Sequence, residues 1–219
     1  MGAGIQPWDG KAMGERLKDL VVALPRTRFD LMDPPDDPGI YLHFLAHRDL
    51  PLLGPLSAGV YPLYVGSATS SLRERQARYA VTLKGVEAFE LSDLYVALLP
   101  VDRTSSALFA EQELLAWLRP LLNGWGFGSK DQGARRSTQR CSAFDALFPG
   151  RTWAPSATAA QRASAALAVT SYLAGLDPEG PRWPPLRGRA SWGGDPSRPR
   201  SSPRPDVHPG RGGRLRSST

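Results

Sequence analysis

Residues 72–83 carry an arginine and a tyrosine on a face that a helix would normally keep apolar. We expect a helix here because Ser71 precedes it and Glu74 stands three residues later, a pattern that caps helix starts. On a helical wheel, Arg75, Gln76 and Tyr79 lie on the side that also carries Leu72 and Leu83. Because an unpaired charge is costly to bury, Arg75 indicates a negatively charged partner, such as a phosphate of the DNA backbone.

Residues 106–118, which we also expect to be helical, carry a carboxylate on the apolar face of the helix. Glu111 lies on the apolar face of this segment, whereas Glu113 lies on the opposite side and is expected to point to water. The leucines assigned to the face of Glu111 are Leu108, Leu114, Leu115 and Leu118. A buried carboxylate is expected to pair with a cation or to bind a metal ion.

Two short apolar segments before these helices each join a glycine to a tyrosine. Gly39-Ile40-Tyr41 opens the segment 39–45, and Tyr64-Val65-Gly66 closes the segment 61–66. We predict a strand in each, and residues 94–101 predict a third strand that is mostly buried. The predicted order of elements is therefore strand, strand, helix, strand, helix.

The remaining segments are predicted from their periodicity and their turn residues. Apolar residues at helical spacing predict a helix over 11–24, and an alanine-rich helix capped by Ser156 is expected over 156–175. Proline and glycine make 46–60 a loop, and the glycine-rich stretch 124–136 is a basic loop.

Composition limits the class of protein. The 219 residues are enough for one domain of ordinary size with an extension. No run of about 18 apolar residues predicts a transmembrane helix, and the N-terminus lacks the pattern of a secretion signal, so we expect a cytoplasmic protein. Cys141, the single cysteine, excludes an internal disulfide and a cysteine-based zinc site.

The positive charge is unevenly distributed along the chain. The net charge is +6, and residues 177–219 hold nine arginines against four acidic residues. The basic pI therefore gives no indication of a basic groove in the fold. Proline, glycine, serine and arginine dominate this segment, a composition that cannot bury enough apolar surface to fold alone. We predict a domain over 1–176 and a disordered tail over 177–219.

The two glycine–tyrosine tripeptides, followed by a helix with Arg-x-x-x-Tyr, resemble the signature of the GIY-YIG nuclease superfamily. A narrower similarity lies in Glu111–Asn123, Gly126–Gly133 and Phe148–Ala154, which look like the type II restriction endonuclease branch typified by cleavage at CCGCGG. The resemblance covers roughly residues 38–155. It implies an α+β fold, in which a small mixed or antiparallel three-stranded sheet is flanked by helices.

The resemblance implies a DNA endonuclease that hydrolyses phosphodiester bonds with one Mg²⁺ per active site, for which Mn²⁺ can substitute. Glu111 would bind the metal, Arg75 would hold a phosphate oxygen, and Tyr41 would accept the proton of the attacking water. The full set of residues with implied catalytic roles is Tyr41, Tyr64, Arg75, Tyr79, Glu111 and Asn123.

The same resemblance implies further roles, and the chain departs from the family's motif at two positions. Tyr64 and Tyr79 would orient water and phosphate or relay the proton, and Asn123 would hold the active-site loop by hydrogen bonds. The alternatives are that Tyr64 is only a core aromatic and that Asn123 only ends a helix. Ser67 stands where many members have lysine, and Tyr79 stands where the branch typically has histidine.

Three functional classes remain open on the sequence. They are a sequence-specific type II restriction enzyme, which we favour, a structure- or damage-directed repair or recombination nuclease, and a catalytically silent DNA-binding relative. A restriction enzyme would act as a homodimer on double-stranded DNA, with a cognate DNA methyltransferase encoded nearby and no membrane partner. Candidate DNA contacts are Arg119, Lys130, Arg135, Arg136 and Arg140. His43 and His47 lack a partner pattern and are expected to have surface or loop roles.

Overall fold

The computed structural model describes residues 10–46, 50–88, 90–127, 141–151, 153–176 and 183. All of them belong to one unit, Met1–Leu186. Five of the predicted functional positions, His47, Lys130, Arg135, Arg136 and Arg140, lie outside the described residues.

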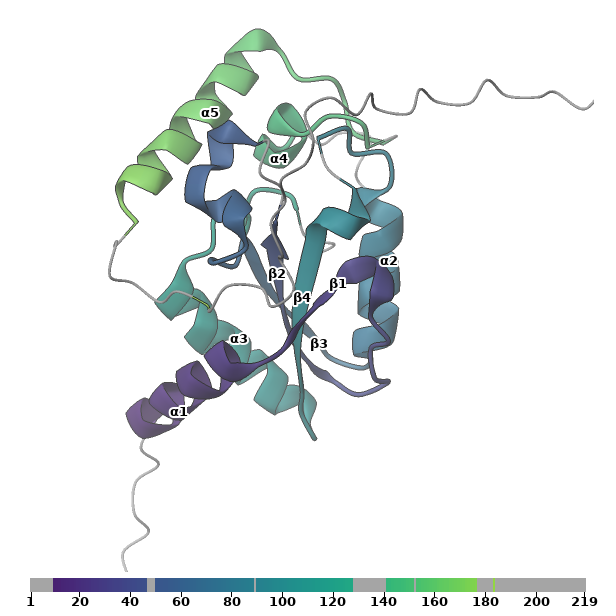
Figure 1. Cartoon of the computed structure of the whole chain (residues 1–219), viewed down its shortest axis with the longest axis vertical. Helices are drawn as coiled ribbons and strands as arrows, with labels where there is room; N and C mark the ends of the chain where they lie inside the picture. The colour runs from purple at the N-terminus through teal and green to yellow at the C-terminus, as the bar shows by residue number, and fades with distance from the viewer. Residues whose placement is uncertain are drawn as a thin grey trace, which may run out of the picture. The chain divides into compact units, whose positions relative to one another are not determined.

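The centre of the described fold is a four-stranded antiparallel sheet with the strand order β1-β4-β2-β3 (Figure 1). The strands are β1 (Arg26–Arg28), β2 (Gly39–Leu45), β3 (Tyr64–Ala68) and β4 (Leu94–Pro100). The predicted α+β fold is confirmed, with one strand more than the three expected. The additional strand, β1, pairs with β4 through Thr27 opposite Val96.

Helices pack on both faces of this sheet. They are α1 (Gly10–Ala23), α2 (Leu72–Leu83), α3 (Thr104–Leu118), α4 (Ala143–Leu147) and α5 (Ala159–Ala174), with short 3-10 helices at Phe29–Leu31, Pro51–Ala58 and Leu91–Asp93. Figure 1 shows α2 on one side of the strands and α3 on the other. The bounds of α2 are those predicted, and the Ser71 side chain accepts a hydrogen bond from the Glu74 amide as its N-cap.

Strand β2 supplies both layers of the core because it is central and fully buried. Its alternation sends Tyr41 and Leu45 into the cluster that also holds residues of α2, α4 and α5. Its other face, with Ile40, Leu42 and Phe44, packs with residues of α1 and α3. Gly39 is required where the strand begins, because a Cβ there would lie 2.6 Å from the Leu99 carbonyl oxygen and 2.7 Å from a Leu72 methyl group.

Three details of the helices differ from the sequence prediction. Leu108 is 44 % exposed, because the buried side of α3 runs through Ala107, Ala110 and Leu114 instead. In α1, Met13 and Leu20, two of the apolar residues whose helical spacing predicted a helix over 11–24, are exposed. Helix α5 is capped by Thr158 rather than Ser156, since the Thr158 side chain and Gln161 form the reciprocal pair of a capping box.

Trp183 packs into the core although it follows the predicted domain boundary at residue 176. Its ring is 2 % exposed and meets Phe44 at 5.4 Å between centroids and Trp117 at 6.2 Å. Its indole nitrogen lies 3.4 Å from the Val21 carbonyl oxygen, to which it donates.

Candidate active site

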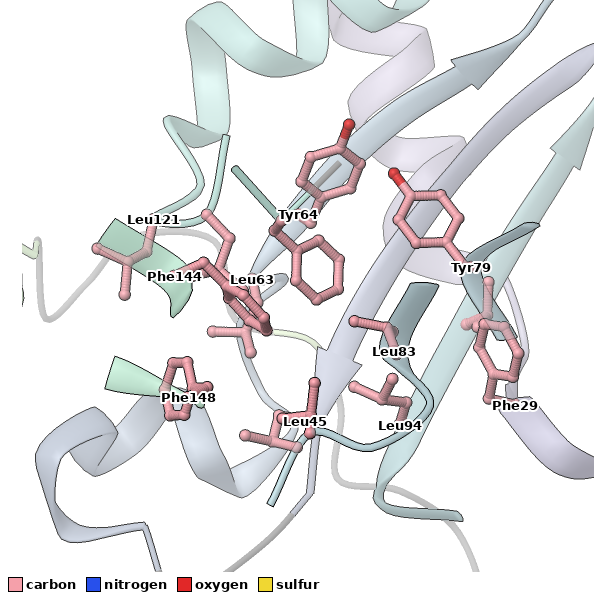
Figure 2. Close-up of a cluster of buried hydrophobic side chains, with 14 of the residues drawn as sticks. Phe29, Leu45, Leu63, Tyr64, Tyr79, Leu83, Leu94, Leu121, Phe144 and Phe148 are labelled. Carbon is pink, nitrogen blue, oxygen red and sulfur yellow. The ribbon is translucent and has the colours of Figure 1, made fainter. Parts of the chain in front are cut away.

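Three tyrosines from three different elements meet beside strand β3. The hydroxyl oxygens of Tyr41, on β2, and Tyr79, on α2, are 3.2 Å apart. The Tyr64 ring, on β3, stacks against Tyr41 at 6.2 Å and meets the edge of Tyr79 at 5.9 Å between centroids. Figure 2 shows the hydroxyls of Tyr64 and Tyr79 pointing to the same side, away from the surrounding leucines and phenylalanines. The rings are therefore part of the core, while the hydroxyls form a polar group at its border.

Gly66 makes room for this arrangement. It lies opposite Tyr41 in the antiparallel pairing of β2 with β3. A Cβ at Gly66 would overlap the Tyr41 hydroxyl and would lie 2.9 Å from the Tyr64 ring. The glycine of the second tripeptide is therefore needed because the phenol of the first tripeptide crosses its backbone.

Burial keeps the three phenols neutral in the isolated protein. It raises the pKa of Tyr41 far above its ordinary value, and the neighbouring Tyr64 and Glu111 add to that increase. The charge of Arg75 and the hydrogen bond with Tyr79 act in the opposite direction. Burial likewise raises the pKa of Tyr64 and Tyr79. Tyr41 is therefore a neutral phenol that shares a hydrogen bond with Tyr79 in the isolated protein.

Ser67 connects the two charged residues of the site. The Arg75 guanidinium, which is half-buried, donates to the Ser67 carbonyl oxygen at 3.3 Å. The Ser67 hydroxyl donates to Glu111 Oε2 at 2.5 Å, from β3 across to α3. One residue of β3 thus holds an arginine of α2 through its backbone and a carboxylate of α3 through its side chain.

Glu111 is buried, as its helical position predicted, with 4 % of its surface exposed. The expectation for Glu113 was wrong, because this residue is partly buried and its carboxylate lies against Gly14 of α1, only 3.1 Å from where a Cβ would stand. The packing of α1 on α3 covers the face of α3 that the sequence assigned to water.

The donor set around Glu111 fits a magnesium ion better than a metal bound entirely by protein. No group of three or more His, Cys, Asp or Glu side chains forms a metal site among the described residues. Mg²⁺ is usually held by one or two carboxylates, with water and substrate phosphate in its other positions. A single carboxylate, fixed by the Ser67 hydroxyl at one oxygen, matches that pattern.

Asn123 closes the free edge of β3. Its side-chain oxygen accepts from the Val65 amide at 2.9 Å, and its side-chain nitrogen donates to the Val65 carbonyl at 2.7 Å. Nearby, the Leu122 amide donates to the Leu63 carbonyl at 2.9 Å. The amide side chain therefore replaces a neighbouring strand on this edge. Arg119, four residues earlier, is exposed and has a left-handed backbone with φ 44° after the end of α3.

His43 belongs to the interior, so the expectation of a surface or loop role was wrong. It is 0 % exposed, and its Nε2 lies 2.9 Å from the Gln76 side-chain oxygen. The signal was present in the sequence. Alternation along β2 places His43 on the same face as Tyr41, and the wheel of α2 places Gln76 beside Tyr79.

The fold and this group of side chains define a nuclease of the GIY-YIG class. The family model described as the Eco29kI GIY-YIG domain matches residues 58–172, just over half of the chain. The chain belongs to this family of type II restriction endonucleases, and it is therefore a DNA endonuclease. The family match begins at residue 58 and so does not include Tyr41, which lies on β2. The antiparallel pairing of β2 with β3 is what places Tyr41 beside Gly66.

No match was found among curated proteins. Within the part of the chain that the structure describes, none of the helices has the length and apolar character needed to span a membrane.

Proposed function

We propose that the protein is a sequence-specific type II restriction enzyme that cuts double-stranded DNA in the presence of Mg²⁺. The observation that carries this proposal is the convergence on the end of β3 of Arg75, Glu111 and the Tyr41–Tyr79 hydroxyl pair. A cation for phosphate, a carboxylate for a metal and a phenol for a proton are the three components that phosphodiester hydrolysis needs.

Arg75 and Glu111 provide the electrostatic part of the mechanism. The Arg75 guanidinium, anchored to the Ser67 carbonyl, binds a non-bridging oxygen of the scissile phosphate as negative charge increases on it. Glu111 holds Mg²⁺ with the carboxylate orientation that the Ser67 hydroxyl fixes. When bound, the ion supplies positive charge that stabilises the phosphate and the leaving 3′ oxygen.

Tyr41 accepts the proton of the attacking water. Its pKa is raised by burial and lowered by Arg75, so additional positive charge at Glu111 favours its ionised form. Tyr79 is within hydrogen-bond distance of the Tyr41 hydroxyl and stabilises the phenolate or carries the proton onward. Tyr64 orients the water and the phosphate, and Asn123 keeps β3 in place through the Val65 backbone.

DNA binding and assembly form the second part of the proposal. Arg119 is exposed on the described surface, and it is proposed to contact the DNA backbone together with Lys130, Arg135, Arg136 and Arg140. A palindromic site is most simply bound by a homodimer, and a methyltransferase encoded nearby would protect the host DNA. Sedimentation of the DNA complex should show two protomers for each duplex, whereas one protomer making single-strand nicks would contradict the dimer.

Digestion of defined plasmids tests the proposed specificity. With Mg²⁺, the products should share one short sequence at every end when they are sequenced, and chelation of the metal should stop cleavage. Mn²⁺ in place of Mg²⁺ should restore it. Ends that follow branched or damaged DNA instead of a sequence would favour a repair nuclease. Tight DNA binding without cleavage in either metal would indicate a catalytically silent relative.

A further inference from the structure

We propose that His43 and Gln76 are positioning residues whose buried hydrogen bond fixes α2 against β2, so that the hydroxyls of Tyr41 and Tyr79 meet. This inference rests on the roles proposed above for the two tyrosines. Neither His43 nor Gln76 is proposed to touch DNA or metal.

The pair connects the two elements that carry the proposed proton path. His43 follows Tyr41 by two residues and lies on the same face of β2. Gln76 directly follows Arg75 in α2 and precedes Tyr79 by about one helical turn. The 2.9 Å contact between His43 Nε2 and Gln76 Oε1 joins the same strand and helix as the 3.2 Å contact between the two tyrosine hydroxyls. A shift of α2 along β2 would change both distances together.

The imidazole also supports the two phenol rings by direct packing. Its centroid is 4.7 Å from that of Tyr79, which it meets edge to face at 84°, and 5.2 Å from that of Tyr41. Phe127 closes the same space at 5.7 Å. His43 therefore contacts both rings whose hydroxyl oxygens must lie at hydrogen-bond distance.

Two polar side chains are an expensive way to fill this space. His43 and Gln76 are 0 % and 1 % exposed. His43 Nδ1 and Gln76 Nε2 make no hydrogen bond to any described residue. Leucine or methionine would fill a similar volume without leaving polar atoms unsatisfied. The polar pair instead provides a directional contact. A hydrogen bond fixes one register between strand and helix, whereas apolar side chains allow several.

The environment of His43 excludes a role as a titrating base. Burial lowers the pKa of the imidazole to about 4, while the hydrogen bond with Gln76 acts in the opposite direction. The groups that face it are Tyr41, Tyr64 and Tyr79, all neutral, together with Gln76, Phe29 and Phe127. The imidazole therefore stays uncharged at neutral pH and acts through position alone.

Two substitutions of Gln76 separate positioning from core filling. Gln76→Met keeps the shape and removes the acceptor, and Gln76→Glu keeps the acceptor oxygen in a carboxyl group that shares a proton with the His43 imidazole. Single-turnover cleavage of plasmid DNA in Mg²⁺ should be slowed about 10-fold or more by Gln76→Met and by only a few-fold by Gln76→Glu. The DNA dissociation constant, measured in Ca²⁺, should be unchanged in both. The pH profile of the cleavage rate should shift in Gln76→Met, because the phenol pair has lost its fixed distance.

Thr82→Val is the matched control. Thr82 is a buried polar residue of the same helix, and its hydroxyl donates to the Arg78 carbonyl at 2.8 Å, away from the tyrosines. The Thr82→Val variant should cleave DNA at the wild-type rate. The double variant His43→Leu/Gln76→Leu removes both polar groups, should fold with a melting temperature near that of the wild type, and should cleave as slowly as Gln76→Met. A wild-type rate and pH profile in Gln76→Met, or a wild-type rate in the folded double variant, would overturn the proposal.

Tyr41→Phe distinguishes this failure from failure of the proposed function. If Tyr41→Phe is inactive while Gln76→Met cleaves at the wild-type rate, only the positioning role is wrong. If Tyr41→Phe itself cleaves at the wild-type rate, the proton path fails, and the positioning role fails with it.

Discussion

Tyr79 occupies the position at which the resemblance of this chain to the restriction branch leads one to expect histidine. Its hydroxyl lies 3.2 Å from that of Tyr41, and burial raises its pKa well above the usual value. A neutral phenol in this place can donate a hydrogen bond to a Tyr41 phenolate, whereas a histidine would titrate about 3.5 pH units lower. Because tyrosine and histidine differ in pKa, substitutions of Tyr79 should change both the cleavage rate and its pH dependence.

We expect Tyr79→Phe to reduce the single-turnover cleavage rate by roughly 10²-fold, the usual scale of acid–base assistance. Tyr79→His should retain partial activity, with its rate profile shifted toward lower pH. The measurement is plasmid cleavage across about pH 6 to 9, a range that spans the ordinary titration of histidine. Wild-type turnover by Tyr79→Phe over that range would remove Tyr79 from the proton path and leave Tyr41 alone.

His43 should make stability depend on pH in a defined window. Its pKa in the folded protein is about 4, below the ordinary histidine value near 6.5. Between those values the unfolded chain binds a proton that the folded protein does not, so stability is complete above about pH 6.5 and falls as the pH decreases toward 4. The full effect is roughly 3 kcal/mol, because one pKa unit corresponds to about 1.4 kcal/mol.

Urea unfolding of the wild type and of His43→Leu at neutral pH and near pH 4.5 isolates this contribution. Carboxylates affect both proteins equally, so the wild type should lose roughly 2 to 3 kcal/mol more than the variant on acidification. Equal losses would show that His43 is protonated as easily in the folded protein as in the unfolded chain.

At the scale of elements, β3 is the strand that the site depends on and also an edge of the sheet. Asn123 satisfies the Val65 amide and carbonyl that the edge leaves open. Asn123→Ala should therefore destabilise the protein by about 1 to 3 kcal/mol and slow cleavage further than the stability loss explains, because Gly66 and Ser67 lose their fixed position.

The control for Asn123 is Thr158→Ala, which removes the N-cap of α5 at a cost of about 1 kcal/mol. Thermal unfolding and single-turnover cleavage should be measured on both variants at a temperature at which both are folded. Thr158→Ala should cleave normally. If Asn123→Ala also cleaves at the wild-type rate, its role is limited to stability.

Local patterns predicted the elements whose signals lie within one turn or one strand. The Ser71 cap, the bounds of α2 and the burial of Glu111 needed only local spacing. Strand β1 was missed because Arg-Thr-Arg has no apolar alternation and forms by pairing with β4, about 70 residues away. Arg26 of β1 also makes contacts with residues far from it in the sequence. Its guanidinium donates to the Gly59 carbonyl and lies over the Phe44 ring.

The reach of local sequence patterns also explains which parts of the site could be predicted. The six residues of the implied catalytic set were named from the family resemblance, and their catalytic roles stay a prediction, but the contacts among them join distant positions. Ser67 was noted only as a departure from lysine, since its bond to Glu111 spans 44 positions. His43 lacked a visible partner because Gln76 is 33 positions away. Side-chain pairs of this kind depend on the packing of α2 and α3 against the sheet.

At the scale of the whole molecule, the arginine-rich C-terminal segment is proposed to add affinity without determining specificity. The family match ends at residue 172, but Trp183 lies in the core. Truncation after Leu186 should leave the cut sequence unchanged and weaken DNA binding most at low salt, because each neutralised phosphate releases counterions. A changed cleavage sequence in this truncated protein would contradict the proposal.

Truncation before Asp177 should behave differently, because it also removes Trp183. The loss of a large buried aromatic side chain costs about 3 to 5 kcal/mol. Trp183→Ala in the full chain is the control and should reproduce the loss in urea unfolding. If both proteins are as stable as the wild type, the domain ends at residue 176, as the sequence predicted.

The central claim is that one carboxylate, Glu111 held by Ser67, makes this fold a metal-dependent DNA endonuclease. The most direct test is single-turnover plasmid cleavage in Mg²⁺ by Glu111→Gln and Glu113→Gln, two substitutions of the same kind in the same helix, with DNA affinity measured in Ca²⁺. We predict that Glu111→Gln binds DNA normally but cleaves at least about 10³-fold more slowly, while Glu113→Gln cleaves like the wild type. Cleavage by Glu111→Gln at the wild-type rate, or equal losses in both variants, would contradict the account.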